Sequence, residues 1–501
     1  MGKTIDFSGR PFHFIGIGGI GMSALAHILA KRELPVSGSD LRSTHIIERL
    51  QKVGVHIFNH QEATNLELFS CNQKQALKEI PASNHENKTF QNESLVVSED
   101  ELSLEQKYLP QVICSTAITN DNSEYLAAKK KGCPVFHRSD ILAALISDYK
   151  SIGVAGTHGK TTTSSLIGYM LLEAGIDPTI IIGGEVDAWD GNARIGAEKG
   201  YLVAEVDESD GSLIKHHPHI GVITNIELDH PDHYQNLDDV INTFQIFAAQ
   251  CDILVGSLDC EIISSYLSPH ITYSLDFNKQ ADYTVKNLVN DNKGARAEVW
   301  ERGIYLGKIN LTVLGNHNVS NTLAAIAVGR KIGLEFSVIV DSLLNFQSPK
   351  RRFEKRGYCN EITFIDDYAH HPSEIKATLS AARSKIDNKL ANRIVVIFQP
   401  HRYSRTFALL EKFATCFNEA DLVVLTDIYS AGEINTNNIY GEDLAKEVSK
   451  NHPKVLYFPS LEDLPQKLPE LLQPKDLVLF LGAGNLNQII PHIIDLCRTS
   501  K

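Results

Sequence analysis

The segment 156–163, which reads Gly-Thr-His-Gly-Lys-Thr-Thr-Thr, constrains the fold of this chain more than any other. It follows the apolar run 152–155 and precedes the helix-like segment 164–167. A loop between a strand and a helix exposes backbone N–H groups at the helix N-terminus, where the helix dipole favours an anion. The lysine of such a loop reaches nucleotide phosphates, and the hydroxyl that follows it binds Mg²⁺. The segment therefore predicts an ATP site in which Lys160 and Thr161 have these roles.

The loop is a shortened variant of the common phosphate-binding pattern. The strict form needs glycine at position 154, where this chain has Val154. The alternative is a glycine-rich turn in which a threonine merely caps a helix. The residues that we expect to contact the nucleotide are Gly156, Thr157, His158, Gly159, Lys160, Thr161 and Thr162.

Length and periodicity predict three α/β domains. A chain of 501 residues exceeds what one hydrophobic core usually supports. Short apolar runs alternate with helical patterns, which is typical of parallel sheets covered by helices. We expect a Rossmann-like domain over 1–147, a central P-loop ATPase-like domain over 148–349 and a Rossmann-like α/β domain over 350–501. Between about 70 and 107 the sequence turns polar and loses periodicity, which predicts a surface insertion in the first domain.

Individual elements follow from the same periodicity. Apolar runs bounded by turn residues predict strands, and apolar residues at helical spacing predict a helix. The expected strands are 12–15, 34–37, 112–115, 152–155, 201–206, 220–224, 362–365, 393–398, 422–425 and 477–481, and a helix is expected over 318–332.

Composition narrows the class of protein. The formal net charge is −13, which disfavours nucleic acid or an anionic membrane as a partner. No run approaches the roughly 18 apolar residues of a membrane span. The eight cysteines contain no Cys-x-x-Cys pair, which favours buried thiols over disulfides or zinc ligands. We expect a cytoplasmic protein, a monomer or a homodimer, that acts on small molecules without nucleic-acid or membrane partners.

A second glycine loop lies near the N-terminus. Residues 16–21 read Gly-Ile-Gly-Gly-Ile-Gly after an expected strand, and Asp40 follows the next strand. Such a loop lets the backbone approach a pyrophosphate, so Gly18, Gly19 and Gly21 are candidates for binding a nucleotide diphosphate. The pattern alone also permits a nicotinamide dinucleotide. Asp40 is either a ligand of the bound molecule or a turn residue.

Acidic residues follow the strand expected at 201–206. An ATP site needs a carboxylate at a neighbouring strand end to hold Mg²⁺, and the segment 205–210 offers four acids. Glu205 is the first choice, and at least one of the other acids belongs to a solvated strand end. The next strand leads to His230, which can bind a second Mg²⁺ or Mn²⁺ beside the phosphates. A zinc site made with His233 is the weaker alternative.

Two further groups of polar residues complete the candidate site. Asn318 and Asn321 lie three residues apart on one helix face, and their amides can recognise adenine, although Asn318 can also serve as a helix N-cap. In the third domain, His370, Arg402 and Arg405 follow strands at the edge where open α/β sheets bind ligands. The two arginines can grip a carboxylate by paired hydrogen bonds, and the alternative places them on a helix surface.

Taken together, these motifs resemble the Mur ligases, which are ATP-dependent amide-forming enzymes of peptidoglycan synthesis. The resemblance covers nearly the whole chain. The matching segments are 16–21, 156–163, 205–210, 224–225, 229–230, 317–321, 350–354, 366–372 and 401–406. The resemblance implies that the first domain binds the UDP of a substrate and not a redox cofactor. It also implies a role in cell-wall synthesis, with ATP and Mg²⁺ or Mn²⁺ as cofactors.

The resemblance further implies a mechanism and a set of roles. The carboxylate of UDP-N-acetylmuramate attacks the γ-phosphate of ATP, and the amine of L-alanine then displaces phosphate from the acyl phosphate. The residues implied to be catalytic are Lys160, Glu205, His230 and His370. Those implied to bind metal are Thr161, Glu205 and His230, and those implied to bind the nucleotide beyond the loop are Asn318, Asn321 and Arg352. The substrate ligands implied are Gly18, Gly19, Gly21, Asp40, Ser115, His370, Arg402 and Arg405.

Two departures from the family pattern and two alternatives stay open. The insertion near 70–107 is longer than expected. Several sister ligases have a carbamylated lysine near the second metal, yet no lysine lies between Lys215 and Lys279, so their second site cannot be assumed here. A ligase that joins a whole tripeptide is the nearest alternative, but the acidic segment Glu-Val-Asp-Glu-Ser-Asp favours L-alanine. An NAD-dependent oxidoreductase is the other alternative, and it leaves the ATP loop unexplained.

Overall fold

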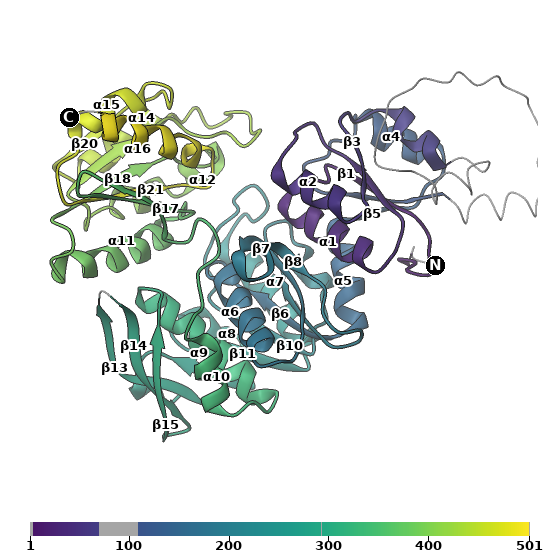
Figure 1. Ribbon diagram of the computed structural model, residues 1–501, viewed down its shortest axis with the longest axis horizontal. Helices are drawn as coiled ribbons and strands as arrows, with labels where there is room; N and C mark the ends of the chain where they lie inside the picture. Colours follow the sequence, from purple (N-terminus) through teal and green to yellow (C-terminus); the bar gives the residue numbers. More distant parts are fainter. Residues whose placement is uncertain (1–3, 70–108, 292, 500–501) are drawn as a thin grey trace, which may run out of the picture. The chain divides into compact units, whose positions relative to one another are not determined.

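The structure of the chain, a computed structural model, describes residues 4–69, 109–291 and 293–499 (Figure 1). The surface insertion expected at about 70–107 lies outside the described residues. The chain forms two compact units, which are described separately below. The first unit comprises Met1–Lys150, Thr179–Gly183 and Gly191–Leu202, and the second comprises Ser151–Pro178, Gly184–Asp190 and Val203–Lys501.

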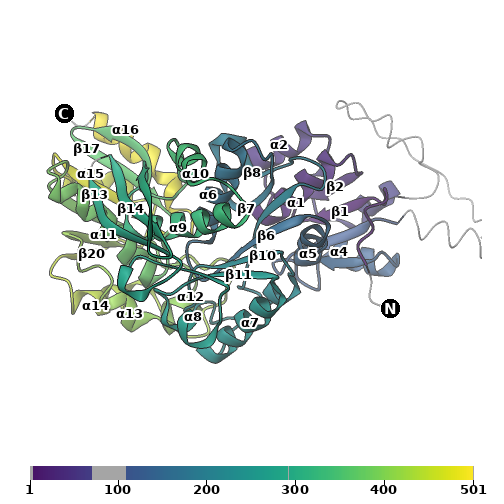
Figure 2. The same cartoon turned by 90° about the horizontal axis from the view of Figure 1, so that it is seen from below.

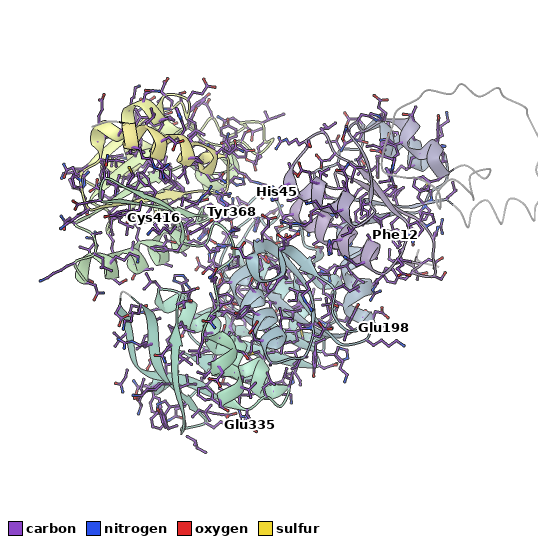
Figure 3. All side chains as sticks on the ribbon, viewed as in Figure 1. Phe12, His45, Glu198, Glu335, Tyr368 and Cys416 are labelled. Carbon is purple, nitrogen blue, oxygen red and sulfur yellow. The ribbon has the colours of Figure 1, made fainter. Side chains whose placement is uncertain are left out.

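The first unit contains a five-stranded parallel sheet in the order β3-β2-β1-β4-β5. Its strands are β1 (Phe12–Ile15), β2 (Val36–Ser39), β3 (His56–Phe58), β4 (Gln111–Cys114) and β5 (Val135–His137). The central strand β1 is wholly buried, and Phe12, which Figure 3 labels, is 0% exposed. Successive connections reach opposite sides of β1, so the strand order reverses there. That reversal is where open α/β sheets bind their ligands.

Helices surround this sheet. They are α1 (Ile20–Lys31), α2 (His45–Lys52), the 3₁₀ helix η1 (Ala63–Phe69), α4 (Ser123–Lys130) and α5 (Arg138–Asp148). The second strand was expected at 34–37 but begins at Val36. Pro35 has no N–H group and contributes only its carbonyl, which accepts the N–H of Phe12, so the register of residue pairs with β1 starts at Val36.

The central sheet has ten strands in the order β15-β14-β13-β12-β11-β10-β6-β9-β7-β8. The strands nearest the phosphate-binding loop are β6 (Lys150–Ala155), β9 (Tyr201–Glu205) and β10 (Ile220–Ile223). The others are β7 (Thr179–Val186), β8 (Gly191–Arg194), β11 (Ile253–Ser257) and β12 (Ile271–Ser274). The helices are α6 (Lys160–Glu173), α7 (Leu237–Gln250), α8 (Glu261–Tyr266), α9 (Asn316–Lys331) and α10 (Phe336–Leu343), and the short 3₁₀ helices are η4 (Asp187–Trp189), η5 (Ser212–Lys215) and η6 (Phe277–Lys279).

An antiparallel extension of the central sheet was not anticipated. Strands β13 (Tyr283–Asp291), β14 (Gly294–Glu301) and β15 (Ile304–Leu311) form a meander, of which Figure 2 labels β13 and β14. The meander joins the sheet because β13 pairs with β12. Short connections at Gly294 and Gly303 join the three strands, and both glycines have positive φ. The meander leads directly into α9, which packs against α6 behind the phosphate-binding loop.

The C-terminal sheet has six strands in the order β16-β17-β21-β18-β19-β20. They are β16 (Glu354–Cys359), β17 (Ile362–Asp367), β18 (Arg393–Phe398), β19 (Leu422–Leu425), β20 (Val455–Tyr457) and β21 (Asp476–Leu481), and β16 alone of these six runs antiparallel to its neighbour. Helices cover both faces: α11 (Pro372–Asp387), α12 (Tyr403–Ala408), α13 (Leu410–Ala414), α14 (Gly441–Ser449), α15 (Leu464–Leu471), η7 (Leu486–Ile489) and α16 (Ile490–Thr499).

Alternation along these strands supplies two hydrophobic cores. Phe364 of β17 packs against α15 and α16, whereas its neighbour Ile365 belongs to the core formed with α11, α13 and α14. Cys416, labelled in Figure 3, lies in the second of these cores. The predicted α/β class is therefore confirmed, with sheets that are parallel in their centres. No helix in the described part of the chain combines the length and apolar character needed to span a membrane.

Candidate active site

The phosphate-binding loop connects β6 to α6 as the sequence predicts. Gly156 has φ +136° and Gly159 has φ +80°, and only glycine adopts such values at low cost. A Cβ atom on Gly156 would lie 2.0 Å from Thr224 Oγ1, because the loop passes close to the end of β10. The helix α6 begins at Lys160, so its first free N–H groups face the loop. This arrangement suits an anionic phosphate.

The ammonium of Lys160 is held within the loop. It donates to the carbonyl oxygens of Gly156 at 2.6 Å and Thr157 at 3.3 Å, and to Glu208 Oε2 at 2.9 Å. Burial raises the pKa of Glu208, and despite the opposing effect of Lys160 that pKa reaches about 7. Burial opposes the charge of Lys160, but Glu208 and the other nearby acids raise the lysine pKa overall. The lysine is therefore a fixed positive charge beside the loop.

Thr161 and Glu205 provide oxygen ligands side by side. The hydroxyl of Thr161, in the first turn of α6, donates to Glu205 Oε1 at 3.1 Å, and Glu205 ends β9 next to β6. A hydroxyl and a carboxylate are hard donors of the type that Mg²⁺ prefers. The residues present therefore fit the predicted magnesium site.

His230 lies beside the same acids. Its Nε2 is 3.6 Å from Asp229 Oδ2 and 3.7 Å from Glu208 Oε1, and its backbone has φ +55°. Burial lowers the pKa of His230, so the ring is neutral at pH 7 and has a free electron pair for a metal. The alternative zinc partner His233 instead lies edge-on to Tyr234 and close to Gly211.

A cavity lies beside the loop, between α9 and α11. It is lined by the predicted residues Asn318, Asn321 and Arg352, by His158 and Gly159 of the loop, and by Glu374 of α11. Asn318 Nδ2 donates to the carbonyl of Leu314 at 2.7 Å, while its Oδ1 lies 3.5 Å from Asn321 Nδ2. The N-cap of α9 is Gly315 and not Asn318, so the alternative role of Asn318 as an N-cap is wrong.

The two arginines that were predicted to grip a carboxylate are each paired with an aspartate. Buried Arg405 donates through Nε to Asp229 Oδ1 at 2.8 Å, and Arg402 donates to Asp232 at 2.6 Å. Burial opposes ionisation of Asp229, but Arg405 holds the pKa of that carboxyl well below its usual range. Arg402 precedes the short helix α12 with φ +70°. The aspartates come from the loop after β10, so this loop and α12 are tied together.

His370 lies close to these pairs. Its Nδ1 is 2.9 Å from the carbonyl of Tyr368, and its ring centroid is 5.9 Å from that of His401. Burial lowers the pKa of His370 to about 4, so the imidazole is neutral at pH 7. The Tyr368 carbonyl accepts a hydrogen bond from Nδ1–H, which leaves Nε2 as the acceptor that can face a ligand.

In the first unit, Asp40 braces the N-terminal glycine loop. Its Oδ2 accepts the N–H of Gly18 at 2.8 Å, and its Oδ1 accepts the N–H of Arg42 at 3.0 Å. Asp40 thus has the turn role that was left open, and it also fixes the loop at the switch point of the sheet. Ser115 follows β4 at the same edge, where the order of strands reverses.

Comparison with known proteins gives a consistent result. Three family profiles match: "Mur ligase family, catalytic domain" over residues 11–150, "Mur ligase middle domain" over 154–329 and "Mur ligase, glutamate ligase domain" over 351–484. The chain belongs to the Mur ligase family. It is therefore an ATP-dependent ligase, and the resemblance predicted from the motifs is confirmed.

Individual relatives of this Mur ligase span its whole length. A protein of Crocosphaera subtropica named UDP-N-acetylmuramate--L-alanine ligase is 69% identical over 503 residues, which cover 100% of this chain and 97% of that protein. A protein of the same name from Gloeothece citriformis is 60% identical and is covered to 99%, as is this chain. Among solved structures, the UDP-N-acetylmuramate-alanine ligase of Thermotoga maritima has a TM-score of 0.77 at 27% identity, with 98% of this chain and 100% of that chain covered.

The structure of this Mur ligase brings together most of the predicted residues of the second unit. Lys160 and His230 both lie beside Glu208, and Thr161 contacts Glu205. The predicted residues of the first unit, Gly18, Gly19, Gly21, Asp40 and Ser115, belong to a separate loop cluster. No contact tests the role of any of these residues, so the roles stay predictions.

Four acids of the site were missed by the sequence analysis. Glu208 was grouped with acids that could end a strand in solvent, yet it is 2% exposed and pairs with Lys160. Asp229 was cited only within a motif. Glu227 and Glu374 gave no signal, although the spacing between His371 and Glu374 forms a capping box at the start of α11. A histidine is an unusual N-cap, which hid this pattern.

Proposed function

We propose that this Mur ligase joins L-alanine to the carboxylate of UDP-N-acetylmuramate at the expense of ATP, as a step of peptidoglycan precursor synthesis. The observation that carries the proposal is the 69% identity, over the whole chain, to a protein named for this reaction. The site supports it, because a lysine, a hydroxyl, two acids and a neutral histidine meet at the ends of β6, β9 and β10.

Phosphoryl transfer is the first step of the proposed reaction. The muramate carboxylate attacks the γ-phosphorus of ATP, ADP leaves, and an acyl phosphate forms. Lys160 stabilises the negative charge that spreads over the transferring group. Thr161 and Glu205 would hold one Mg²⁺ and His230 a second Mg²⁺ or Mn²⁺, and a bound metal would neutralise phosphate charge during the transfer.

Amide formation is the second step. The amine of L-alanine attacks the acyl carbon, and phosphate leaves from the tetrahedral intermediate. His370, with its neutral ring, and the arginines Arg402 and Arg405 line the side of the site proposed for these groups. Asn318, Asn321 and Arg352 would bind the nucleotide, and the glycine loop with Asp40 and Ser115 would bind the UDP moiety in the first unit.

The proposal includes three domains and a cellular setting. We place the UDP-binding domain at 1–147, the ATP-binding domain at 148–349 and the amino-acid-binding domain at 350–501. The protein would act in the cytoplasm as a monomer or a homodimer.

A phosphate-release assay tests the proposed substrate. Purified protein receives ATP, Mg²⁺ and UDP-N-acetylmuramate, with either L-alanine or the tripeptide L-alanyl-γ-D-glutamyl-meso-diaminopimelate. We expect phosphate release that depends on L-alanine, together with a product whose mass equals the nucleotide substrate plus alanine less water. Release only with the tripeptide would overturn the proposal.

A further inference from the structure

His158 occupies an unusual position in the phosphate-binding loop. Its backbone is fixed on both sides, because its N–H donates to Asn225 Oδ1 at 2.9 Å and its carbonyl accepts from Asn225 Nδ2 at 3.0 Å. The side chain lies between two carboxylates: its Nδ1 is 3.3 Å from Glu374 Oε1 and its Nε2 is 3.9 Å from Glu227 Oε2. The histidine therefore connects the loop to a residue of α11 in the C-terminal domain.

Glu374 contacts the phosphate-binding loop and the start of α11 at once, and its Oε2 also lies 3.2 Å from Nδ1 of the His370 ring. One oxygen, Oε1, faces His158, while the other, Oε2, accepts the N–H groups of His370 at 3.0 Å and His371 at 3.3 Å. These two N–H groups belong to the first residues before α11, where a carboxylate at the third helical position closes a capping box. The same carboxylate thus fixes the backbone of His370 and contacts the loop.

A second connection runs parallel to the first. Ser373 Oγ donates to Glu227 Oε2 at 2.7 Å, and the N–H of Glu227 donates to Thr157 Oγ1 at 2.9 Å. Thr157 and His158 are neighbours in the loop, and Ser373 and Glu374 are neighbours in α11. Two adjacent loop residues are therefore connected to two adjacent helix residues.

The same side chains could instead be read as a metal site. Within the described residues, His158, Glu227 and His371 are the one group of three such ligands whose donor atoms lie within 4.8 Å of one another. However, Nδ1 of His371 accepts the N–H of Ser373 at 3.2 Å, which occupies its lone pair. Burial opposes a charge on His158, but Glu227 and Glu374 raise its pKa to about 9, and a protonated ring offers no lone pair. His158 is therefore paired as a cation with the glutamates, and neutral His371 uses the electron pair of Nδ1 to cap α11, so neither ring offers a free electron pair to a metal.

We propose that the contact between His158 and Glu374, here called the latch, couples the position of the phosphate-binding loop to the start of α11. Through the latch, the loop determines where His370 is held. Both are positioning residues: His158 acts through the loop, and Glu374 acts on both the backbone N–H and the ring Nδ1 of His370. The importance of His370 rests on the function proposed above, whereas the latch itself is a property of the loop and the helix. Nucleotide binding to the loop then orders the part of the C-terminal domain that faces the second substrate.

Hydrogen exchange tests the latch without requiring the ligase reaction to take place. Amide exchange of residues 370–378 is measured by mass spectrometry with and without saturating ADP. We expect saturating ADP to slow exchange in the wild-type protein by about fivefold or more, and to have no effect in His158→Asn at an ADP concentration that an ADP titration of this variant shows to be saturating. His217→Asn, a change at an exposed histidine, is the matched control and should behave as wild type. Protection that persists in His158→Asn would overturn the proposal.

A double-mutant cycle tests whether the two residues act together. We expect His158→Asn and Glu374→Gln each to lower kcat for L-alanine-dependent phosphate release about 10-fold, and the double variant to be no more than twofold worse than either. His158→Lys, which keeps the positive charge, should recover at least a third of wild-type kcat. Glu411→Gln, at an exposed glutamate of the same domain, is the control. Losses that multiply to about 100-fold would overturn the latch.

Two further outcomes are distinguishable. A wild-type protein that shows ADP-dependent protection but releases no phosphate with L-alanine would refute the proposed function and leave the latch standing. Protein treated with EDTA and then given Zn²⁺ should exchange at the same rate as untreated protein. Zn²⁺-dependent protection of residues 370–378 would instead identify the cluster as a metal site and overturn the latch.

Discussion

Paired charges dominate the candidate site at the scale of single residues. Lys160 is paired with Glu208, Arg405 with Asp229 and His158 with Glu374. In each pair at least one member is almost completely buried or lies in the loop, where removing its partner leaves an uncompensated charge. Substitution of one member of such a pair should therefore destabilise the site more than the loss of one member of a solvent-exposed ion pair would.

Lys160→Ala should abolish turnover while UDP-sugar binding in the first unit is retained. The variant removes the charge nearest the loop carbonyls, and the loss of one such group commonly costs about 100- to 1000-fold in kcat. Phosphate release and the Kd for UDP-N-acetylmuramate check the two halves of the prediction. Lys412→Ala, at an exposed lysine of α13, is the control. Near-normal turnover by Lys160→Ala would contradict the assigned role.

Buried His371 predicts a loss of stability in mild acid. Burial, aided by the nearby positive His158, lowers the pKa of His371 to about 4. The unfolded chain binds a proton near pH 6.5 and the folded chain does not, so this contribution to stability is complete above pH 6.5 and is lost as the pH falls toward 4. At pH 5 the loss amounts to about 2 kcal/mol for this one residue.

Thermal unfolding at several pH values measures this effect. His371→Asn keeps a side chain that can cap α11, and we expect its Tm to fall less between pH 7.5 and pH 5 than that of the wild-type protein. His217→Asn should follow the wild-type slope. An equal fall in all three proteins would show that other groups cause the acid lability.

The sequence predicts the site residues that lie in local motifs, but it does not predict the acids that pair with them. The loop around Lys160 is recognisable because its glycines, lysine and hydroxyl act through nearby backbone groups. Arg405 and Asp229 are 176 positions apart, and Ser373 and Glu227 are 146 apart. Such pairs depend on how the sheets and helices pack, and no pattern in either segment specifies the other.

At the scale of elements, the two ends of α6 depend on glycine in different ways, because Gly156 lies in the loop before this helix and Gly175 follows its last turn. Gly156 and Gly175 both have positive φ, but an added Cβ would contact Thr224 only at Gly156 and would meet nothing within 4 Å at Gly175. Substitution at Gly175 therefore adds backbone strain alone, whereas substitution at Gly156 adds both strain and a steric clash with the end of β10.

Gly156→Ala and Gly175→Ala form a matched pair. Gly175→Ala should lower the free energy of unfolding by about 1 kcal/mol, the cost of left-handed backbone for alanine. Gly156→Ala, with φ +136°, should cost at least as much strain and in addition displace the loop, so that ADP affinity falls at least about 10-fold. Denaturant unfolding and ADP titration provide the measurements. Equal ADP affinity in the two variants would show that the loop tolerates a side chain there.

The elements that were predicted best are buried strands, and the element that was missed is half-exposed. Strands such as β18 and β21 are continuous apolar runs between helices, which the sequence pattern identifies directly. The meander β13–β15 has polar residues on its exposed face and a shift of register between Lys286 and Val289. This irregularity breaks the alternation on which a strand prediction relies.

At the scale of the whole molecule, each unit carries its own candidate ligand-binding edge. The first unit places the glycine loop and Asp40 at the switch point of its sheet, and the second unit places the phosphate-binding loop at the ends of β6, β9 and β10. The fold class was predictable because each sheet has its own motif and strand pattern. The boundaries between domains were set from weaker signals and stay predictions.

Gly18→Ala should affect the two edges differently. An added Cβ would lie 2.8 Å from Asp40 Oδ2, which would displace the carboxylate that holds the loop. We expect the KM for UDP-N-acetylmuramate to rise about 10-fold or more, while the Kd for ADP stays within twofold. Lys160→Ala should show the reverse pattern. A parallel loss of both affinities in Gly18→Ala would indicate that the substitution unfolds the protein.

The pairing of Lys160, Arg402 and Arg405 with acids has a consequence for how substrates arrive. All three positive groups are already neutralised by neighbours, and the chain as a whole carries a net charge of −13. An approaching anionic nucleotide therefore meets net repulsion at long range, and added salt, which screens this repulsion, should raise the association rate. The site then discriminates among anions only at close range. There a phosphate or carboxylate of the ligand must displace the internal acid from the lysine or arginine, and it does so only if its own hydrogen-bond geometry is better.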